Sequence, residues 1–374
     1  MAEQVIKPDL DFINSVINSG GESLKKCYQC ATCSVVCNVT PDNNPFPRKE
    51  MLHAQWGLKD KLLSNPDIWL CHNCDDCTKH CPRGAKPSDV LAAIREKSIE
   101  ENAVPRVMGK IVTQPKMTLV ALAIPLLLFL AVLGLTGHLG IPKGDIVYSK
   151  FFPIAYIEAI FMSAMALAGV AYLVSLSRFW NNMSRVNGQS YSKGFIPAVI
   201  ETLVEFATHA RFGKCDANAG RKSAHMLVFY AFVGLAITTI WVTVYYYLPE
   251  PYKKLSPISL SDPMKWLGNA SALALLGGTL LVILNRIKDK GYVSETSSFD
   301  WTFAIMILLL GITGILTEVI RLAGVAELAY PVYFIHLLFV FYTIVYFPYS
   351  KLAHMGYRIL AITYSKMAGR DINI

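Results

Sequence analysis

Eight of the nine cysteines in the chain fall into two runs with the spacing of iron–sulfur ligands. The first run is Cys27, Cys30, Cys33 and Cys37, and the second is Cys71, Cys74, Cys77 and Cys81. Both runs read C-x2-C-x2-C-x3-C, in which the first three thiolates hold one cluster and the fourth reaches the neighbouring cluster. The sequence therefore predicts two 4Fe-4S clusters, one on Cys27, Cys30, Cys33 and Cys81, and the other on Cys71, Cys74, Cys77 and Cys37.

Zinc is the alternative for so many cysteines, but zinc sites use two C-x2-C pairs, four ligands in all. Such crowding in a reducing compartment indicates metal ligation rather than disulfides. Two neighbouring clusters let an electron cross in short hops, and no catalytic acid or base stands out around them. His72 and His80 flank the second run and either tune a cluster by hydrogen bonding or lie in solvent. Residues 48–61 have the pattern of a short helix pair, and Cys215 stands alone.

Five histidines lie in or beside the apolar part of the chain, where an ionisable side chain is costly and usually functional. They are His138, His209, His225, His336 and His354. His336 and His354 are 18 residues apart, which is five helical turns, so we expect them to share one helix face about 27 Å apart. We expect His225 and His354 at matching depth near the inner membrane face, where they form the best ligand pair for a b-type haem.

A second haem would lie toward the outer face on His336, with His138 or His209 as its other ligand. His209 also follows Glu201 and Glu205 at four-residue intervals. This spacing predicts either a proton- or quinone-facing side of a helix or a solvated one. Each of these histidines has the alternative of being a structural side chain.

Three charged residues are expected at the outer ends of membrane helices, near the depth of His336: Glu158, Glu318 and Arg321. A quinol site needs a proton acceptor and a hydrogen-bond donor close to a redox centre. These residues are therefore a candidate quinone site, with interfacial charges of no function as the alternative.

The elements that must position these residues follow from hydropathy. The chain is 53% hydrophobic and 17% charged, with a mean hydropathy of +0.38, which is too apolar for an ordinary soluble enzyme. Residues 1–110 are polar and cysteine-rich, whereas residues 111–374 contain apolar stretches of roughly 20 residues, the length of a helix that spans a bilayer. The predicted spans are 117–136, 152–176, 224–248, 264–284, 301–320 and 331–349. We expect an all-α protein, with a two-cluster ferredoxin domain followed by a six-span bundle of cytochrome b type.

Charge predicts the orientation of the chain. Residues 1–110 carry 14 basic and 14 acidic side chains, so the net charge of +8 belongs to the membrane part. The inner connections and the tail hold 15 Lys or Arg and the outer connections hold 6, as the positive-inside rule requires when the N-terminal domain is cytoplasmic. The first residues lack the pattern of a cleaved signal. We expect a multi-pass protein of the cytoplasmic membrane with the N-terminal domain and the C-terminus in the cytoplasm, and a surface helix over residues 195–212 on the inner face.

Several segments resemble known electron-transfer proteins. CYQCATCSVVC (27–37) and CHNCDDCTKHCP (71–82) resemble the small ferredoxin-like subunit of heterodisulfide reductases. In residues 208–354, THARFGKC, RKSAHMLVFY, YFIHLL and KLAH resemble the membrane cytochrome b subunit of those enzymes and the gamma subunit of respiratory nitrate reductase. The fusion of both parts is similar to the membrane subunits of the quinone-interacting membrane-bound oxidoreductase (Qmo) family of sulfate-reducing bacteria.

This resemblance implies a subunit that passes electrons between menaquinone, one or two b haems and the two clusters. It implies two cytoplasmic partner subunits that carry flavin and iron–sulfur clusters, and adenylylsulfate reductase as the acceptor in sulfate respiration. It also implies that the last five spans form the haem-binding core. Alone, the chain would catalyse nothing except quinol oxidation.

Other function classes remain open. One is the membrane subunit of a heterodisulfide reductase-like or other quinone-linked complex. A catalytic heterodisulfide reductase resembles subunits with paired-cysteine CCG motifs, and no two cysteines are adjacent in this sequence. A passive membrane anchor needs neither inward histidines nor two full cluster motifs.

Overall fold

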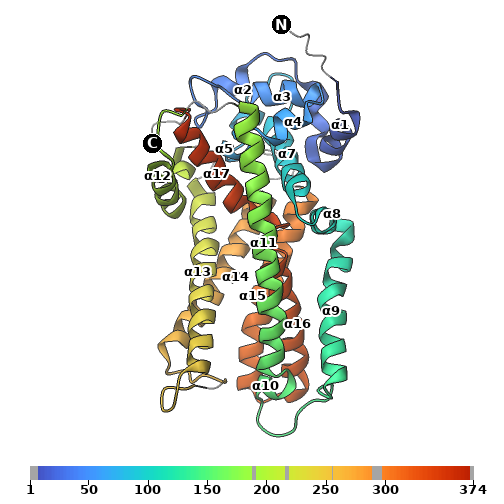
Figure 1. Cartoon of the computed structure of the whole chain (residues 1–374), viewed down its shortest axis with the longest axis vertical. Coiled ribbons are helices and arrows are strands. Elements are labelled where there is room, and N and C mark those ends of the chain that lie inside the picture. The colour runs from blue at the N-terminus through green and yellow to red at the C-terminus, as the bar shows by residue number, and fades with distance from the viewer. Residues whose placement is uncertain (1–6, 188–190, 215–218, 255, 289–296, 371–374) are drawn as a thin grey trace.

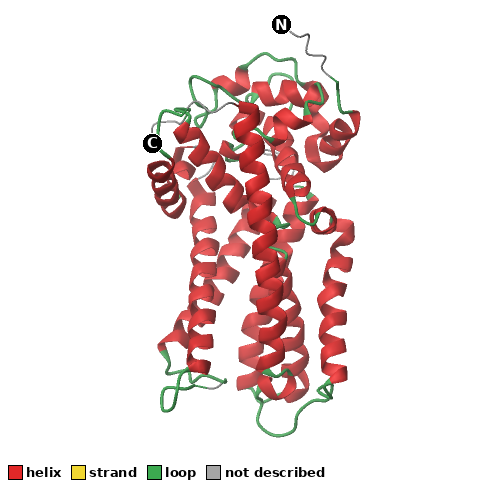
Figure 2. Cartoon of the chain, viewed as in Figure 1, coloured by secondary structure: helices red, strands yellow, loops and turns green. Residues whose placement is uncertain are grey.

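The computed structural model describes residues 7–187, 191–214, 219–254, 256–288 and 297–370. Within these ranges the chain forms helices, turns and loops and no strand, as Figure 2 shows. The predicted all-α class is confirmed. Cys215 lies outside the described residues.

The cysteine-rich head is a group of short helices at one end of the molecule (Figure 1). Its helical segments are α1 (Leu10–Val16), η1 (Ile17–Gly21), η2 (Glu22–Lys26), α2 (Thr32–Val35), α3 (Arg48–Gln55), α4 (Lys59–Leu63), α5 (Asp67–Leu70), α6 (Asp76–Lys79), α7 (Pro87–Asn102) and α8 (Arg106–Thr113). The pair α3 and α4 is the one predicted over residues 48–61. Residue 110, the predicted domain boundary, lies inside α8 and not in a linker.

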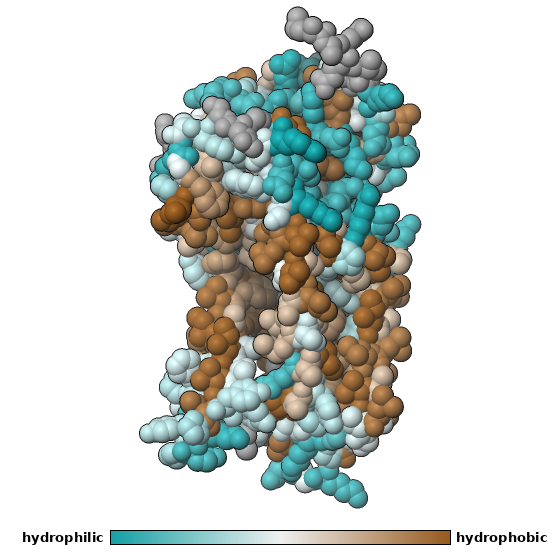
Figure 3. Space-filling view, viewed as in Figure 1, coloured by the Kyte–Doolittle hydropathy of each residue, from teal (hydrophilic) through white to brown (hydrophobic). Residues whose placement is uncertain are grey.

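Long apolar helices form the rest of the molecule. They are α9 (Thr118–Leu135), α11 (Ile154–Asn187), α13 (Ala219–Tyr247), α14 (Pro263–Lys288), α15 (Ser298–Leu322) and α16 (Ala326–Val345). Six helices in the described part of the chain are long and apolar enough to cross a membrane. A brown, hydrophobic belt covers them in Figure 3, between teal surfaces on the head and at the opposite end. The chain is therefore a multi-pass membrane protein with a polar head.

Shorter elements join or flank these helices: η3 (Pro115–Met117), α10 (Tyr148–Phe151), α12 (Phe195–Thr208), η4 (Ala210–Lys214), η6 (Lys351–Ala353) and α17 (His354–Met367). The last helix, α17, lies beside the head and not among the spans (Figure 1). It brings the C-terminal region to the same end of the molecule as the N-terminal one.

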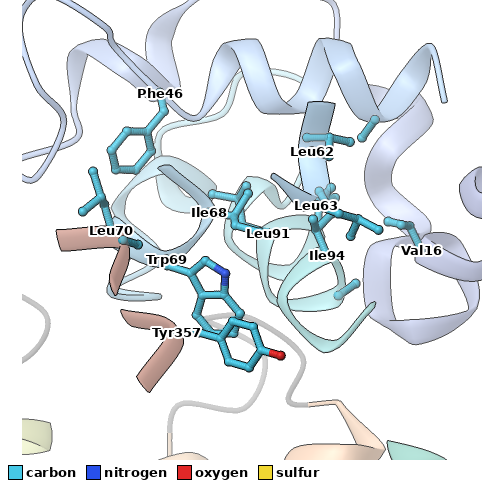
Figure 4. Packing of buried hydrophobic residues seen from close by; sticks show 14 of the residues in the cluster. Val16, Phe46, Leu62, Leu63, Ile68, Trp69, Leu70, Leu91, Ile94 and Tyr357 are labelled. Atoms are coloured by element: carbon cyan, nitrogen blue, oxygen red, sulfur yellow. The ribbon is translucent and has the colours of Figure 1, made fainter. Parts of the chain in front are cut away.

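The head is seated on the membrane part through a shared aromatic core. Trp69 of α5 stacks on Tyr357 of α17, with ring centroids 5.0 Å apart and an interplanar angle of 14°, as seen in Figure 4. Phe179, at the head end of α11, packs edge-on against both rings. All three side chains are buried. The helix α11 is 34 residues long, longer than the predicted span 152–176, because its last turns belong to this core.

Two sequence expectations about helix continuity are wrong. His336 and His354 do not share one helix, because α16 ends at Val345 and α17 begins at His354. Pro348 cannot donate the backbone hydrogen bond that would continue α16, and the Ser350 hydroxyl accepts from Leu352 N to start the next turn.

The surface helix is also shorter than expected. Its predicted range 195–212 is cut at Thr208 by His209, which has a left-handed backbone with φ of 52°. The predicted face of Glu201, Glu205 and His209 is therefore not formed. Instead Glu205 pairs with Arg211 and Lys366 at 2.7 Å and 2.5 Å.

Close packing of α13 on α14 depends on Gly278, and this contact is testable. A Cβ at Gly278 would lie 2.9 Å from Leu227 Cβ and 3.0 Å from the backbone nitrogen of Val228. Gly278→Ala must push the helices apart, and we expect the free energy of unfolding in detergent to fall by about 1–3 kcal/mol, measured as a lower Tm. Gly277→Ala is the control, because nothing lies within 4 Å of its Cβ. Equal Tm values for the two variants would contradict the packing.

Candidate functional site

The two cysteine loops have the same unusual backbone. In residues 27–33, Gln29 and Ala31 have positive φ angles of 62° and 70°, and in residues 71–77, Asn73 and Asp75 have φ angles of 55° and 69°. Each loop then runs into a single helical turn, α2 or α6. Positive φ is uncommon for residues other than glycine and costs energy. Its repetition at matching positions shows that both loops curl in the same way around their cysteines.

The thiols interact electrostatically as two groups of four. Burial raises the pKa of Cys33 to about 11, and its thiol neighbours Cys27, Cys30 and Cys81 raise it further. We call these four the first set. Burial likewise raises the pKa of Cys37 to about 12, with the Cys71 and Cys74 thiols next to it.

Cys77 completes the other group of four thiols. Burial raises its pKa, and Cys71, Cys74 and Cys37 are its thiol neighbours. We call Cys71, Cys74, Cys77 and Cys37 the second set. Cys37 also lies in the electrostatic reach of Cys33, so the two sets are adjacent. Because burial favours neutral thiols, four thiolates at such a place need a positive metal centre, which a 4Fe-4S cluster supplies. The residues present fit two clusters with the cross-ligation that the spacing predicts, and the individual ligands stay a prediction.

Two histidines lie next to each other near the loop of the second set. His225 on α13 and His354 at the start of α17 have ring centroids 6.4 Å apart, with an interplanar angle of 83°. Two imidazoles bound on opposite sides of one metal ion, each at about 2 Å, have ring centres roughly 6 Å apart. The geometry therefore fits a single metal between them, as in a bis-histidine haem.

Hydrogen bonds fix which nitrogen of each ring is free. His354 Nδ1 lies 2.6 Å from the carbonyl oxygen of Lys351, and a carbonyl only accepts, so Nδ1 carries the proton. His209 Nδ1 donates in the same way to Ala207 O at 3.2 Å. Its Nε2 therefore accepts from His225 Nδ1, 2.9 Å away. Both His225 and His354 are left with an unprotonated Nε2, the form that binds a metal.

His209 thus orients a candidate ligand in this structure. Its left-handed position at the end of α12 turns the ring away from the Glu201 side of the helix and toward α13. Burial lowers the pKa of His354 to about 3, so that imidazole stays neutral at physiological pH.

A large apolar cavity opens beside the histidine pair. It has a volume of about 600 Å³ and is lined by parts of α11, α13, α14, α15 and α16, together with His225 and His354. The hollow between α13 and α11 on the face shown in Figure 3 has brown and beige walls. Arg286 and Lys351 are the cations of its lining, and both also line a polar cavity of about 230 Å³ on the side of the head. An apolar slot with cations at its polar end fits a planar macrocycle with acidic substituents.

The loop of the second set reaches this histidine site. His72, which follows Cys71, lines a cavity of about 60 Å³ together with His209, His225 and His354. Arg358 of α17 donates to His72 Nδ1 at 2.8 Å. The sequence predicts that His72 either tunes a cluster by hydrogen bonding or lies in solvent. The structure contradicts the solvated alternative, and because the hydrogen bonds of His72 are to Arg358, the tuning of a cluster stays a prediction. The position of His72 beside Cys71 did not predict its place in this cavity, because the residues that it contacts are more than 130 positions away in the chain.

A second cavity lies at the other end of the bundle. It has a volume of about 300 Å³, and His336, Glu318 and Arg321 all line it. Glu318 is paired with Lys265 and with Arg321, the latter at 3.1 Å, and His336 Nδ1 lies 3.0 Å from Thr313 Oγ1. The structure therefore brings together two members of the predicted quinone site with the outer histidine.

Aromatic residues of the same cavity were missed from the sequence. Tyr148 and Tyr333 line it and stack with centroids 4.3 Å apart and an interplanar angle of 13°. Aromatic residues near the ends of membrane helices are typical of an interfacial belt, and their spacing alone does not separate that role from a place in a cavity.

Two predicted residues lie away from this cavity. Glu158 is absent from its lining and accepts a hydrogen bond from Tyr247. His138 is absent as well; it lies 3.0 Å from Thr136 Oγ1 and beside Tyr156. Among the described residues that line the cavity, His336 is the one histidine.

These features define a class: a membrane-bound electron-transfer protein with a two-cluster ferredoxin head. Residues 23–85 match the 4Fe-4S dicluster domain family, which confirms the predicted head and its two clusters. Residues 104–371 match the family of citrate utilization protein B, and the chain belongs to this family.

Relatives agree with both halves. Citrate utilization protein B of Escherichia coli is 26% identical over 366 residues, which cover 91% of this chain and 89% of that protein. A subunit of the H(2):CoB-CoM heterodisulfide,ferredoxin reductase of Methanothermobacter marburgensis is 34% identical over 91 residues, 24% of this chain and 49% of that protein. An iron-sulfur subunit of the CoB--CoM heterodisulfide reductase of Methanocaldococcus jannaschii is 36% identical over 93 residues, 23% of this chain and 50% of that protein. The chain thus spans about half the length of these archaeal relatives. The fused arrangement is confirmed, and the narrower resemblance to the membrane subunits of Qmo complexes stays a prediction.

Cross-ligation of the clusters can be tested by pairing serine variants. If Cys81 serves the first set, Cys81→Ser and Cys33→Ser should remove the same cluster. The EPR signals that remain should match, and iron and acid-labile sulfide should fall by about half, since one of two clusters is lost. Cys37→Ser should instead match Cys77→Ser. If Cys37→Ser matched Cys33→Ser, each run would hold its own cluster and the assignment would be wrong.

Proposed function

We propose that this chain is the membrane electron-transfer subunit of a quinone-linked oxidoreductase, carrying electrons between menaquinone, haem b and the two 4Fe-4S clusters. The observation that carries the proposal is the pair His225 and His354, whose ring spacing and free Nε2 atoms suit one iron. Bound there, a haem supplies a one-electron centre between the membrane and the head.

The protein residues around this centre have separate roles. His209 and the Lys351 carbonyl hold the two imidazoles in the ligating tautomer. The apolar walls of the 600 Å³ cavity exclude water, and Arg286 and Lys351 give the acidic edge of a haem its cationic partners. His72 lines the same small cavity as the histidine pair. Because His72 follows Cys71, it connects the haem site to the second set.

The cavity around His336 supports a quinone site. The stacked rings of Tyr148 and Tyr333 offer a flat surface for a quinone ring. Glu318 is positioned to take up a proton, and Arg321 holds that carboxylate in place. Glu158 is not part of this proposal. His138 is absent from this lining, so a second haem on His336, which would connect this cavity to the histidine pair, needs a ligand other than His138.

The orientation and the partners follow from the same arrangement. The head and α17 lie at one end (Figure 1), the end that carries the excess of basic residues, so we place it in the cytoplasm. The relatives' names refer to citrate utilization and to heterodisulfide reduction. Because these differ, we assign the substrate to a soluble partner and the electron path to this chain. Two flavin and iron–sulfur subunits of Qmo type, with adenylylsulfate reductase as acceptor, are the partners that the sequence resemblance implies.

Loss of either ligand should abolish haem binding. In the purified full-length chain, His225→Ala and His354→Ala should each remove nearly all of the reduced-minus-oxidised b-type bands, because one imidazole alone does not retain the iron in a bis-histidine site. Iron–sulfur content should be unchanged. His138→Ala is the control and should keep the bands. A chain with no porphyrin, or with full bands in both variants, would rule out the pair as haem ligands.

Quinol oxidation should depend on Glu318 and not on Glu158. In Glu318→Gln, reduction of the haem by a menaquinol analogue should be slower by about 100-fold, because the proton acceptor is lost. Reduction by dithionite, which needs no quinone site, should be unaffected. Glu158→Gln should stay within about twofold of the unmodified protein in both assays. Stopped-flow absorbance gives both rates, and equal slowing in the two variants would contradict the site.

A further inference from the structure

Three arginines converge on the loop of the second set. Arg95 Nη2 donates to Asn73 Oδ1 at 3.0 Å, and Arg221 Nη1 donates to Asn73 O at 3.1 Å. Arg358 Nη2 donates to His72 Nδ1 at 2.8 Å. Residues 72 and 73 lie between the cysteines 71 and 74, so the three guanidinium groups contact the loop that joins these thiols, two through side chains and one through the Asn73 carbonyl.

The arginines come from different parts of the molecule. Arg95 belongs to α7 of the head, whereas Arg221 and Arg358 belong to α13 and α17 of the membrane part. Two of the three charges therefore reach the second set only because the head is seated on the membrane helices.

The first loop is built differently at the same positions. Tyr28 and Gln29 occupy the places of His72 and Asn73. Gln29 Nε2 donates to Cys27 Sγ at 3.4 Å and to Gln55 Oε1 at 3.3 Å. Arg48 acts electrostatically on the Cys27 thiol, so the first loop has one such arginine where the second loop has three. Arg83 lies over the ring of Tyr28 at 4.1 Å, but Tyr28 is 67% exposed, and solvent screens charges there.

Charge at these positions bears directly on redox equilibrium. A cluster held by four thiolates is anionic, and it gains one more negative charge with each electron. Nearby cations favour the reduced form, and the effect is larger in a buried place of low dielectric constant. Arginine suits this role because its guanidinium group stays charged when buried.

We propose that Arg95, Arg221 and Arg358 raise the reduction potential of the cluster on the second set relative to that on the first set. The step is a one-electron reduction in which no bond forms or breaks and no proton moves. The electron comes from the cluster on the first set or returns to it, and the raised potential favours its transfer to the second cluster. The inference rests on the two-cluster head of the proposed function and not on its haem or quinone.

Acidic neighbours make the three arginines unequal. Asp75 Oδ2 lies 3.8 Å from Arg221 Nη1, and Asp75 also accepts a hydrogen bond from Ser88. Asp89 and Asp300 line the adjacent polar cavity with Arg95 and Arg221. The Asp75 carboxylate offsets part of the charge of Arg221, so removal of Arg358 should have a larger effect than removal of Arg221.

The test is a potentiometric titration of the purified full-length chain, followed by EPR of both clusters. Arg358→Gln keeps a hydrogen-bond donor for His72 and removes the charge. The comparison is made at the midpoint potential of the second cluster in the unmodified protein. At that potential we expect the reduced-to-oxidised ratio of the second cluster in Arg358→Gln to be about tenfold lower, which is equivalent to a shift of about 59 mV for one electron. The other midpoint should not move. Arg358→Lys, which restores a positive charge, should recover most of the shift.

Further variants separate an electrostatic role from a structural one. Arg95→Gln should lower the same midpoint, and it serves as an independent variant if Arg358→Gln loses iron. Arg83→Gln, at the exposed first loop, is the matched control and should leave that midpoint unchanged. Unchanged midpoints in both Arg358→Gln and Arg95→Gln, or equal shifts of both clusters, would overturn the inference. The b-type bands of the same samples report on the haem separately. Their absence would contradict the proposed haem path and would leave the inference about the cluster potential unaffected.

Discussion

The stack of Trp69 on Tyr357 is the contact on which the rest of the arrangement depends. It joins α5, which ends one residue before Cys71, to α17, which begins at His354. A buried aromatic pair of this kind contributes roughly 0.5–1.5 kcal/mol beyond the area it buries, and Phe179 closes the core from α11. Because the stack fixes α5 against α17, it also fixes the distance between the second set and the histidine pair. Electron transfer falls steeply with distance, so a head that pivoted could not serve this site.

Neutral imidazoles and charged side chains have different roles around that junction. The histidines are held neutral by burial and by hydrogen bonds through Nδ1, while Arg286 and Lys351 line the same cavity as charged groups. Lys351 and Asp300 are paired, which limits the cost of placing both at the edge of an apolar cavity. This division keeps the Nε2 atoms available to a metal, and it leaves cations where acidic groups of a bound cofactor would lie.

Short-range spacing predicted the parts of the protein that are local. Each cysteine run brings three thiols of one set together within a few residues, and the apolar stretches specify the membrane helices by length. The features that spacing did not predict depend on the backbone conformation of single residues or on contacts between residues far apart in the chain. The sixth span is predicted to continue through residue 349, but Pro348 and Ser350 end the helix earlier. The left-handed backbone of His209 takes this residue off the predicted face of Glu201 and Glu205. The contact between Arg358 and His72 joins residues 286 positions apart, which no periodicity reveals.

Fusion of head and membrane part in one chain has a physical consequence for this electron path. The archaeal relatives match 24% and 23% of this chain, whereas in this chain the surface that receives the head belongs to the same polypeptide. A contact within one chain avoids the loss of translational and rotational freedom that two separate proteins incur when they associate. The Trp69 stack and the arginine contacts at residues 72 and 73 can therefore be modest and still hold the head in place at any protein concentration. These contacts leave the first loop, with Tyr28 at its surface, as an exposed part of the head.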